Sequence, residues 1–290
     1  MRVVLTGATG FLGSRVLPLL AAHDVLCLSR EPGAVPRQPR ARAIRADLGR
    51  DGDWAGEIAA FRPEWCLHLA WEGLPDYSLG RCRANLDASL RLLDVLAQAG
   101  LQRMVVAGSC WEYGRASGAL REDQAPVDAG VFAAAKLALL AMVDSVARQA
   151  AFEYRWARIF FVYGPGQRPQ SLLPHLRAAY AAGRTPDLRE PAAVQDFVHV
   201  DDVAAALQML VTAPGPSGVF NVGSGVPTSV AAVAAGAADY YGRPRTFEAG
   251  AAGSGCWADI TKLRTVTGWR PRIVIADGLA STLAALDAAT

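Results

Sequence analysis

Thr6-Gly7-Ala8-Thr9-Gly10-Phe11-Leu12-Gly13 is the stretch that decides the fold, since an apolar run precedes it at residues 3–5 and a helix-like segment follows it. Glycines with this spacing allow a tight turn, let the backbone approach a pyrophosphate, and let a helix pack closely on a strand. The first turn of such a helix offers free N–H groups to phosphate. A second apolar run at residues 25–28 completes a strand–turn–helix–strand order, which predicts a dinucleotide site rather than a turn without a ligand.

The same alternation continues through the first two-thirds of the chain. Apolar runs lie at residues 3–5, 25–28, 65–69, 104–107 and 155–161, and helix-like segments lie at 11–22, 85–98 and 132–150. Runs that are apolar at nearly every residue are typical of strands that helices cover on both faces. We therefore predict an α/β fold, a doubly wound parallel-sheet Rossmann domain with right-handed crossovers.

The character of the sequence changes after about Gly164, where proline and glycine become frequent. Residues 195–211 then resemble a strand followed by a helix. We predict that residues 1–162 and 192–212 form the dinucleotide-binding Rossmann domain. Residues 163–191 and 213–290 are predicted to form a small, discontinuous C-terminal α/β substrate-binding lobe, with a cleft between the two.

The bulk composition argues against several classes of protein. The 290 residues carry a net charge of +2, which indicates neither a nucleic-acid partner nor a membrane partner. Five scattered cysteines without C-x-x-C spacing indicate neither disulfides nor a zinc site, and we expect no metal. No apolar run reaches the ~18–20 residues that span a bilayer, and the first residues lack a signal-peptide pattern. We therefore expect a cytoplasmic protein.

The residues after the second predicted strand bear on the choice of dinucleotide. An NAD site of this type usually carries an acidic residue there, which accepts hydrogen bonds from the ribose hydroxyls. This chain has Ser29 and Arg30 instead, and further arginines follow up to Arg50. A guanidinium suits a ribose 2′-phosphate, so NADP is predicted in preference to NAD. A solvated loop is the alternative explanation for the run of arginines.

The pattern Gly7-x-x-Gly10-x-x-Gly13 resembles that of the extended short-chain dehydrogenase/reductases, the NAD(P)-dependent epimerase/dehydratase family. That family includes nucleotide-sugar epimerases, dehydratases and ketoreductases. Further segments resemble it, in the same order, along nearly the whole chain: Asp47-Leu48, His68-Leu69-Ala70, Asn85, Tyr163-Gly164-Pro165-Gly166, residues 196–202, Asn221-Val222-Gly223 and Gly268-Trp269-x-Pro271. The resemblance and the glycine loop together assign these cofactor-binding residues: Gly7, Thr9, Gly10, Phe11, Leu12, Gly13, Ser29, Arg30, Asp47, Leu48, Leu69, Ala70 and Lys136.

The resemblance also implies a catalytic set of Ser or Thr, Tyr and Lys. The hydroxyl holds the substrate oxygen, and the phenol gives or takes a proton while hydride moves to or from the nicotinamide. The lysine lowers the pKa of the phenol and orients the ribose. By position, Ser109 matches the hydroxyl and Lys136 matches the lysine, but Phe132 stands where the family has tyrosine.

A phenylalanine at position 132 fills the space of the tyrosine but has no ionisable proton. Three explanations stay open. The chain is an inactivating Tyr→Phe variant, or an enzyme that uses another acid such as Glu112, Tyr113 or a water, or a dinucleotide-binding protein that has lost catalysis.

The residues after Ser109 bear on the reaction. The 4,6-dehydratases that this chain resembles place an Asp-Glu pair next to the catalytic hydroxyl, and this chain has Cys110 and Trp111 there. Dehydration is therefore disfavoured, which leaves ketoreduction, oxidation or 4-epimerisation. The predicted NADP preference favours reduction of a keto group on a nucleotide-linked deoxysugar.

Four residues are predicted to bind the substrate: Trp71, Cys110, Trp111 and Gln195. The resemblance implies an arginine that grips the diphosphate where this chain has Gln195, and a second one in a stretch, residues 248–258, that contains no basic residue. Arg168, Arg184 or Arg189 could substitute for them. A ketoreductase or epimerase acting on a non-nucleotide natural-product intermediate therefore stays an alternative. The resemblance also implies a homodimer formed through residues 85–98 and 132–150.

Overall fold

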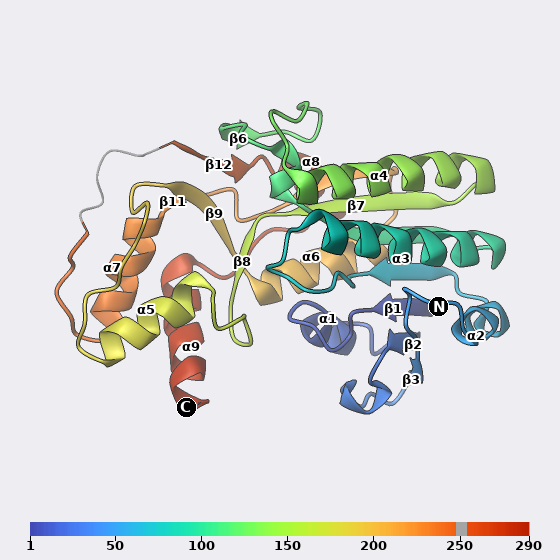
Figure 1. Ribbon diagram of the computed structural model, residues 1–290, viewed down its shortest axis with the longest axis horizontal. Helices are drawn as coiled ribbons and strands as arrows, with labels where there is room; N and C mark the ends of the chain where they lie inside the picture. Colours follow the sequence, from blue (N-terminus) through green and yellow to red (C-terminus); the bar gives the residue numbers. More distant parts are fainter. Residues whose placement is uncertain (248–253, 290) are drawn as a thin grey trace.

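The computed structural model describes residues 1–247 and 254–289, and its largest element is a parallel sheet (Figure 1). Among the described residues this sheet has seven strands in the order β10-β7-β5-β4-β1-β2-β3, with every neighbouring pair parallel. The strands are β1 (Arg2–Thr6), β2 (Asp24–Ser29), β3 (Ala41–Arg45), β4 (Trp65–His68), β5 (Arg103–Ser109), β7 (Glu153–Ile159) and β10 (Gly218–Val222). The predicted doubly wound Rossmann fold is confirmed.

Helices cover both faces of this sheet. On one face, residues such as Val3 and Leu5 pack with α1 (Gly13–Leu19) and α6 (Val200–Thr212). On the other face, Val4 packs with α2 (Trp54–Phe61), α3 (Leu79–Gln98) and α4 (Val131–Ala150). Successive residues of β1 thus point to opposite apolar layers, which explains why the strands are apolar at nearly every position.

A smaller sheet lies to the left in Figure 1. It contains β6 (Gly118–Leu120), β9 (Val194–His199), β11 (Pro227–Ser229) and β12 (Gly255–Ala258), in the order β11-β9-β12-β6, and β8 (Phe161–Tyr163) also pairs with β9. Three helices beside it, α5 (Leu172–Ala181), α7 (Val230–Tyr240) and α9 (Ile275–Ala288), share a separate apolar cluster. The remaining elements are α8 (Thr261–Thr267) and two 3-10 turns, η1 (Pro32–Ala34) and η2 (Cys110–Tyr113).

Strand pairing departs from the predicted domain boundaries at three places. We assigned residues 192–212 to the large domain, but β9 pairs within the smaller sheet. We assigned residues 213–290 to the lobe, but β10 pairs with β7 and forms one edge of the large sheet. Residues 118–120, placed in the first predicted segment, pair with β12 in the smaller sheet. The chain crosses between the two sheets more often than the composition indicated. The boundaries could not be predicted because pairing between segments far apart in the sequence leaves no local pattern.

The arginine-rich segment contains a strand that the apolar pattern missed. Residues 41–45 pair with β2 as the edge strand β3. Two of the arginines form ion pairs around it, Arg40 with Asp24 and Arg42 with Glu57. An edge strand faces solvent on one side, so charged residues replace the continuous apolar run by which buried strands are recognised.

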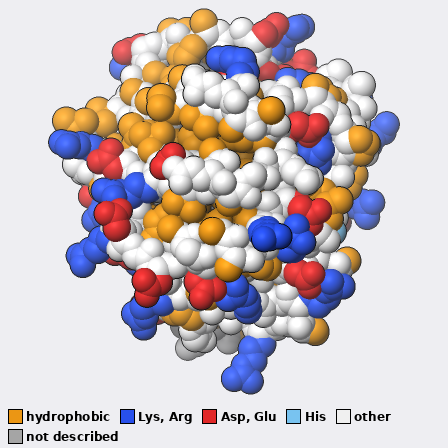
Figure 2. Space-filling view, turned by 90° about the vertical axis from the view of Figure 1, so that its right-hand side faces the viewer, with side chains coloured by type: hydrophobic (Ala, Val, Ile, Leu, Met, Phe, Trp, Pro, Cys, Tyr) orange, Lys and Arg blue, Asp and Glu red, His pale blue; other side chains and the backbone are white. Residues whose placement is uncertain are grey.

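The surface carries mixed charges. Figure 2 shows basic and acidic side chains interspersed over one face of the molecule, among apolar and uncharged ones. None of the helices formed by the described residues is both long and apolar enough to cross a membrane.

Candidate functional site

The glycine loop closes against the ends of two neighbouring strands, β1 and β4. The backbone of Gly7 has a φ of +74°, and a Cβ there would lie 3.0 Å from the amide nitrogen of Ala70. The Thr6 hydroxyl oxygen accepts hydrogen bonds from the amides of Leu69 and Ala70, each at 3.1 Å. At Gly13, a Cβ would overlap the carbonyl oxygen of Gly7 and lie 2.7 Å from its carbonyl carbon. Glycine is therefore required sterically at residues 7 and 13.

This loop borders a cleft of about 1030 Å³. In the described part of the chain, the amides of Phe11 and Leu12 donate to no protein acceptor, and both residues line the cleft. Free amides beside a glycine turn suit the pyrophosphate of a dinucleotide. Of the predicted cofactor residues, these line the cleft: Gly7, Thr9, Gly10, Phe11, Leu12, Gly13, Ser29, Arg30, Leu48, Leu69, Ala70 and Lys136.

Asp47 is the one predicted cofactor residue that does not line this cleft. Its carboxylate accepts a hydrogen bond from the amide of Gly49 at 3.0 Å and lies 3.5 Å from Arg50. In the structure it stabilises the turn that follows β3.

Arg30 and Glu31, just after β2, and Glu72, after β4, bring one cation and two carboxylates to the cleft. Arg30 donates to the carboxylate of Glu72 at 3.0 Å, and both side chains are exposed. The hydroxyl oxygen of Ser29 accepts a hydrogen bond from the amide of Glu31 at 3.1 Å. An ion pair this exposed is weak, so the guanidinium of Arg30 is available to an incoming phosphate.

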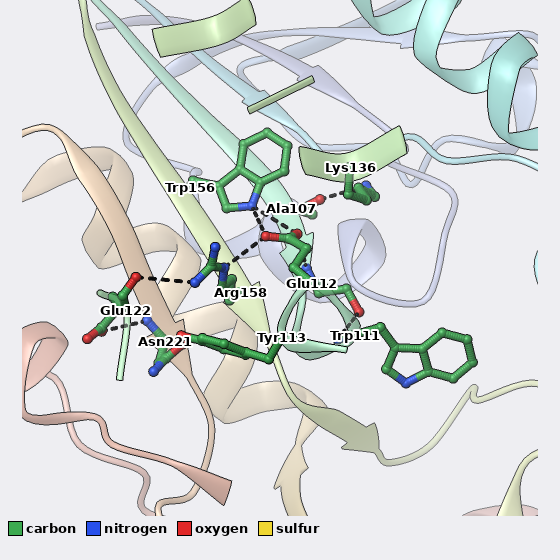
Figure 3. Close-up of polar contacts among 10 residues, drawn as sticks. Ala107, Trp111, Glu112, Tyr113, Glu122, Lys136, Trp156, Arg158 and Asn221 are labelled. Carbon is green, nitrogen blue, oxygen red and sulfur yellow. Dashed lines mark hydrogen bonds and ion pairs between the residues drawn. The ribbon is translucent and has the colours of Figure 1, made fainter. Parts of the chain in front are cut away.

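Lys136 is a buried cation in the cleft wall. Its Nζ donates to the carbonyl of Ala107 at 2.8 Å (Figure 3). The same atom lies 3.9 Å from the centre of the Trp71 ring. Burial lowers its pKa from the ordinary 10.5 to about 8, although the carboxylate of Glu112 opposes this. The carbonyl and the indole ring both favour the charged form, and they orient the amine in the cleft wall.

This pKa gives a stability prediction for Lys136→Met. Between pH 8 and 10.5 the unfolded chain holds a proton that the folded chain has lost, so the lysine reduces stability most below pH 8. This cost fades as the pH rises toward 10.5. We compare the free energy of unfolding of Lys136→Met with that of the parent. We expect this difference to be more favourable to the variant at pH 7 than at pH 10, by on the order of 3 kcal/mol.

Urea unfolding of both proteins at the two pH values measures this difference. Lys262→Met is the matched control, because that lysine is only half-buried and should give a smaller difference. A relative stability of Lys136→Met that does not change with pH would contradict the assigned cost.

Phe132 lies within a group of aromatic rings that border the cleft, here called the aromatic wall: Trp71, Tyr77, Trp111 and Phe132. The ring of Phe132 makes edge contacts with the rings of Trp71 at 5.5 Å, Tyr77 at 5.2 Å and Trp111 at 5.8 Å. Tyr77 and Trp111 contact each other at 4.8 Å. Contacts of this kind fix the rings relative to one another.

Ser109 ends β5 and faces the same cleft. Its hydroxyl oxygen accepts a hydrogen bond from the amide of Trp111 at 3.2 Å. The hydroxyl proton has no acceptor among the described residues, so it is available to a substrate oxygen.

Glu112 and Tyr113, which the sequence offered as replacement acids, do not face the cleft. The Glu112 carboxylate is fully buried and accepts hydrogen bonds from Trp156 and, at 2.9 Å, from Arg158 (Figure 3). The Tyr113 hydroxyl donates to Asn221 at 2.7 Å. Both groups belong to an interior network behind η2, so neither is placed to give a proton directly to a ligand in the cleft.

The loop between β4 and α3 carries Trp71, which the sequence indicated, and Tyr77, which it did not. Asn85 anchors it, because its side chain accepts from the amide of Glu72 at 2.6 Å and donates to the Glu72 carbonyl at 3.0 Å. A single tyrosine in a loop gives no periodic signal. In the sequence, the match of Asn85 to the family asparagine was the one indication that this loop has a fixed position.

The candidate substrate residues Trp71, Cys110, Trp111 and Gln195 all line the cleft. Cys110 is 5% exposed and packs in a small apolar cluster, and burial raises the pKa of its thiol. Of the three arginines considered for the diphosphate, Arg168 lines the cleft, and Arg184 and Arg189 do not. Residues 248–258, where the family has its second diphosphate arginine and this chain has no basic residue, lie partly outside the described part of the chain, at 248–253.

A parallel Rossmann sheet whose glycine loop shares one cleft with a serine and a buried lysine defines the class of dinucleotide-dependent oxidoreductases and epimerases. A model of the NAD dependent epimerase/dehydratase family matches residues 3–223. The chain belongs to this family, and it is an NAD(P)-dependent oxidoreductase/epimerase.

Similar proteins cover the chain from end to end. It is 29% identical to the UDP-glucose 4-epimerase of Mycolicibacterium smegmatis, over 98% of this chain and 97% of that protein. It is 30% identical to the dTDP-6-deoxy-L-talose 4-dehydrogenase (NAD(P)(+)) of Kitasatospora kifunensis, over 93% and 91%. The structure of MoeE5 in complex with UDP-glucuronic acid and NAD is 29% identical, with a TM-score of 0.87 and all of both chains covered.

Proposed function

We propose that this protein is an NADP-dependent oxidoreductase that reduces a keto group on a nucleotide-linked deoxysugar. The observation that carries this proposal is the shared cleft, which the glycine loop, Ser109 and Lys136 all line. When bound, the nicotinamide supplies the hydride for the reduction. Ser109 would donate a hydrogen bond to the carbonyl oxygen, and Lys136 would hold the nicotinamide ribose.

The preference for NADP rests on Ser29 and Arg30. Neither side chain repels a 2′-phosphate, and the exposed Arg30–Glu72 pair opens at little cost. A bound 2′-phosphate would then accept hydrogen bonds from the guanidinium.

The nucleotide-linked substrate rests on the relatives and on the size of the cleft. The relatives above are named for UDP- and dTDP-linked sugars, and one structure holds UDP-glucuronic acid beside NAD. A cleft of about 1030 Å³ is at the upper end of ordinary ligand sites. Arg168, an exposed cleft residue, would replace one of the missing diphosphate arginines.

A 4-epimerase that keeps NAD is the second candidate function. The pairing of Arg30 with Glu72 favours it, because this pair brings a carboxylate to the end of the cleft where an NAD ribose would need an acceptor. An epimerase would return its nicotinamide to the starting redox state in every cycle.

The proposed function also extends to the assembly and its location. Helices α3 and α4 pack together along one side of the large sheet, and we place the face of a homodimer there. All five cysteines are free thiols, which is consistent with a reducing cytoplasm.

The test is single-turnover oxidation of NADPH with a panel of dTDP- and UDP-linked 4-keto-6-deoxyhexoses. We expect oxidation with at least one ketone, and an NADPH rate at least ~10-fold above the NADH rate, since a lost charge-assisted contact is worth about 1.4 kcal/mol or more. Arg30→Ala should remove most of this preference. Phe132→Tyr, which restores the family phenol, is the positive control.

Three other outcomes would contradict the proposal. Interconversion of 4-hydroxy epimers with bound NAD, and no net oxidation of NADPH, would favour the epimerase. A melting temperature that no nucleoside diphosphate raises would favour a non-nucleotide substrate. Dinucleotide binding without turnover in either protein would indicate a binding protein.

A further inference from the structure

Position 132 lacks a phenol, but another phenol lies beside it. Tyr77 lines the cleft, and the centre of its ring is 5.2 Å from that of Phe132 with the planes at 61°. Its ring also contacts the indole ring of Trp111, two residues after Ser109, at 4.8 Å. Tyr77 therefore lies in the cleft against the rings of both Phe132 and Trp111.

The loop holds the backbone of Tyr77 in place. The carboxylate of Asp76 accepts a hydrogen bond from the amide of Ser78 at 2.9 Å, which forms a tight turn centred on Tyr77. The Tyr77 carbonyl accepts from the thiol of Cys82, a residue of α3, at 3.6 Å. A proton donor must stay within hydrogen-bond reach of its acceptor, and an anchored loop meets that need.

The other phenols are less suitable. The chain has seven tyrosines, and in the described residues only Tyr77 and Tyr163 line the cleft. Tyr163 is 4% exposed and packs against His199, and burial raises its pKa well above the ordinary 10. Tyr77 is partly exposed, and its hydroxyl has no hydrogen-bond partner within the described chain. It can therefore donate to a ligand and recover a proton from water.

We propose that Tyr77 is the proton donor that replaces the tyrosine absent from position 132. This inference rests on the proposed function. In the reduction, the carbonyl carbon gains hydrogen and two electrons from the dinucleotide, which is oxidised, and the O–H bond of Tyr77 breaks as its proton goes to the carbonyl oxygen. The phenolate then takes a proton from water. Ser109 donates a hydrogen bond to the same oxygen, and Phe132 keeps the Tyr77 ring in position.

A cycle of four proteins tests this role: the parent, Tyr77→Phe, Phe132→Tyr and the double variant. Each is measured by single-turnover NADPH oxidation with the 4-ketosugar panel. The dissociation constants for NADPH and for the nucleotide sugar are measured separately by titration of tryptophan fluorescence. Tyr163→Phe tests the other phenol in the cleft, and Tyr240→Phe removes a phenol outside it.

We expect Tyr77→Phe to lose ~100-fold or more of the parent rate, as loss of a general acid predicts. Both dissociation constants should stay within about 3-fold of the parent values, since the ring remains. The double variant should recover to within about 10-fold of Phe132→Tyr, because a phenol at position 132 makes Tyr77 dispensable. Tyr240→Phe should match the parent.

The proposal fails if Tyr77→Phe keeps the parent rate, if Tyr163→Phe causes the loss instead, or if Phe132→Tyr does not rescue the double variant. If Phe132→Tyr turns over and the parent does not, the role of Tyr77 is wrong while the proposed function stands. If no protein in the series turns over, the proposed function is wrong and the role of Tyr77 falls with it.

Discussion

Gly13→Ala is expected to weaken dinucleotide binding severely. The added methyl group would overlap the carbonyl oxygen of Gly7 and lie 2.7 Å from its carbonyl carbon and 2.8 Å from the Cα of Ala8. All three atoms belong to the backbone, so no side-chain rotation relieves the clash, and the glycine turn must open. We expect the dissociation constant for NADPH to rise by ~100-fold or more, about 2.7 kcal/mol.

Fluorescence titration with NADPH measures this loss, and Gly56→Ala is the matched control. Gly56 lies within α2, where an added methyl group would meet no atom within 4 Å, and alanine is the better helix former. The control should bind NADPH as the parent does. Unchanged affinity in Gly13→Ala would show that the dinucleotide does not bind across this turn.

Glu112→Ala, in the interior network behind the cleft, is expected to destabilise the protein strongly. Glu112 is fully buried, forms an ion pair with Arg158 at 2.9 Å, and accepts hydrogen bonds from the amide of Ser109 at 2.8 Å and from the Trp156 indole (Figure 3). Its removal leaves a buried guanidinium without a counter-charge, which typically costs about 3–5 kcal/mol. We expect this loss in the free energy of unfolding measured with urea.

Asp123→Ala is the control for this prediction, because the carboxylate of Asp123 forms an exposed pair with Arg121 and its loss should change stability little. Glu112→Gln should fall between the two variants, since the amide keeps its hydrogen-bonding oxygen but loses the charge. A stability of Glu112→Ala equal to that of the control would mean that water replaces the lost carboxylate beside Arg158.

The parts of the fold that were predicted from sequence are those with local signals. The glycine loop, the buried strands and the long helices follow from spacing and apolar periodicity. For example, the helix predicted at residues 85–98 is α3, which starts at Leu79 because Ser78 caps it. The strand β3 was missed because an edge strand carries arginines. The predicted run at 155–161 is divided between β7, which ends at Ile159, and β8, which begins at Phe161 and pairs with β9 in the smaller sheet.

The candidate site was predicted where the residues belong to an extended motif. Ser109, Lys136 and the glycine loop, which the resemblance brought together, line one cleft in the structure. The sequence could not show that Glu112 and Tyr113 lie away from the cleft, because burial depends on which strands lie alongside. Trp156 and Arg158 take up the Glu112 carboxylate from β7, 44 and 46 residues further along the chain. The loop that carries Tyr77 is fixed by Asn85, which was recognised only as a family residue.

The edge strand β10 also has a consequence for how the chain is made. Residues 218–222 pair with residues 155–159 of β7, about sixty positions earlier, and they complete one edge of the large sheet. During synthesis, β7 therefore emerges with one unpaired edge and waits until more than two hundred residues have been translated. An exposed, apolar strand edge is a template for pairing with other chains. Between the synthesis of β7 and that of β10, the nascent chain therefore presents an unpaired strand edge to other chains.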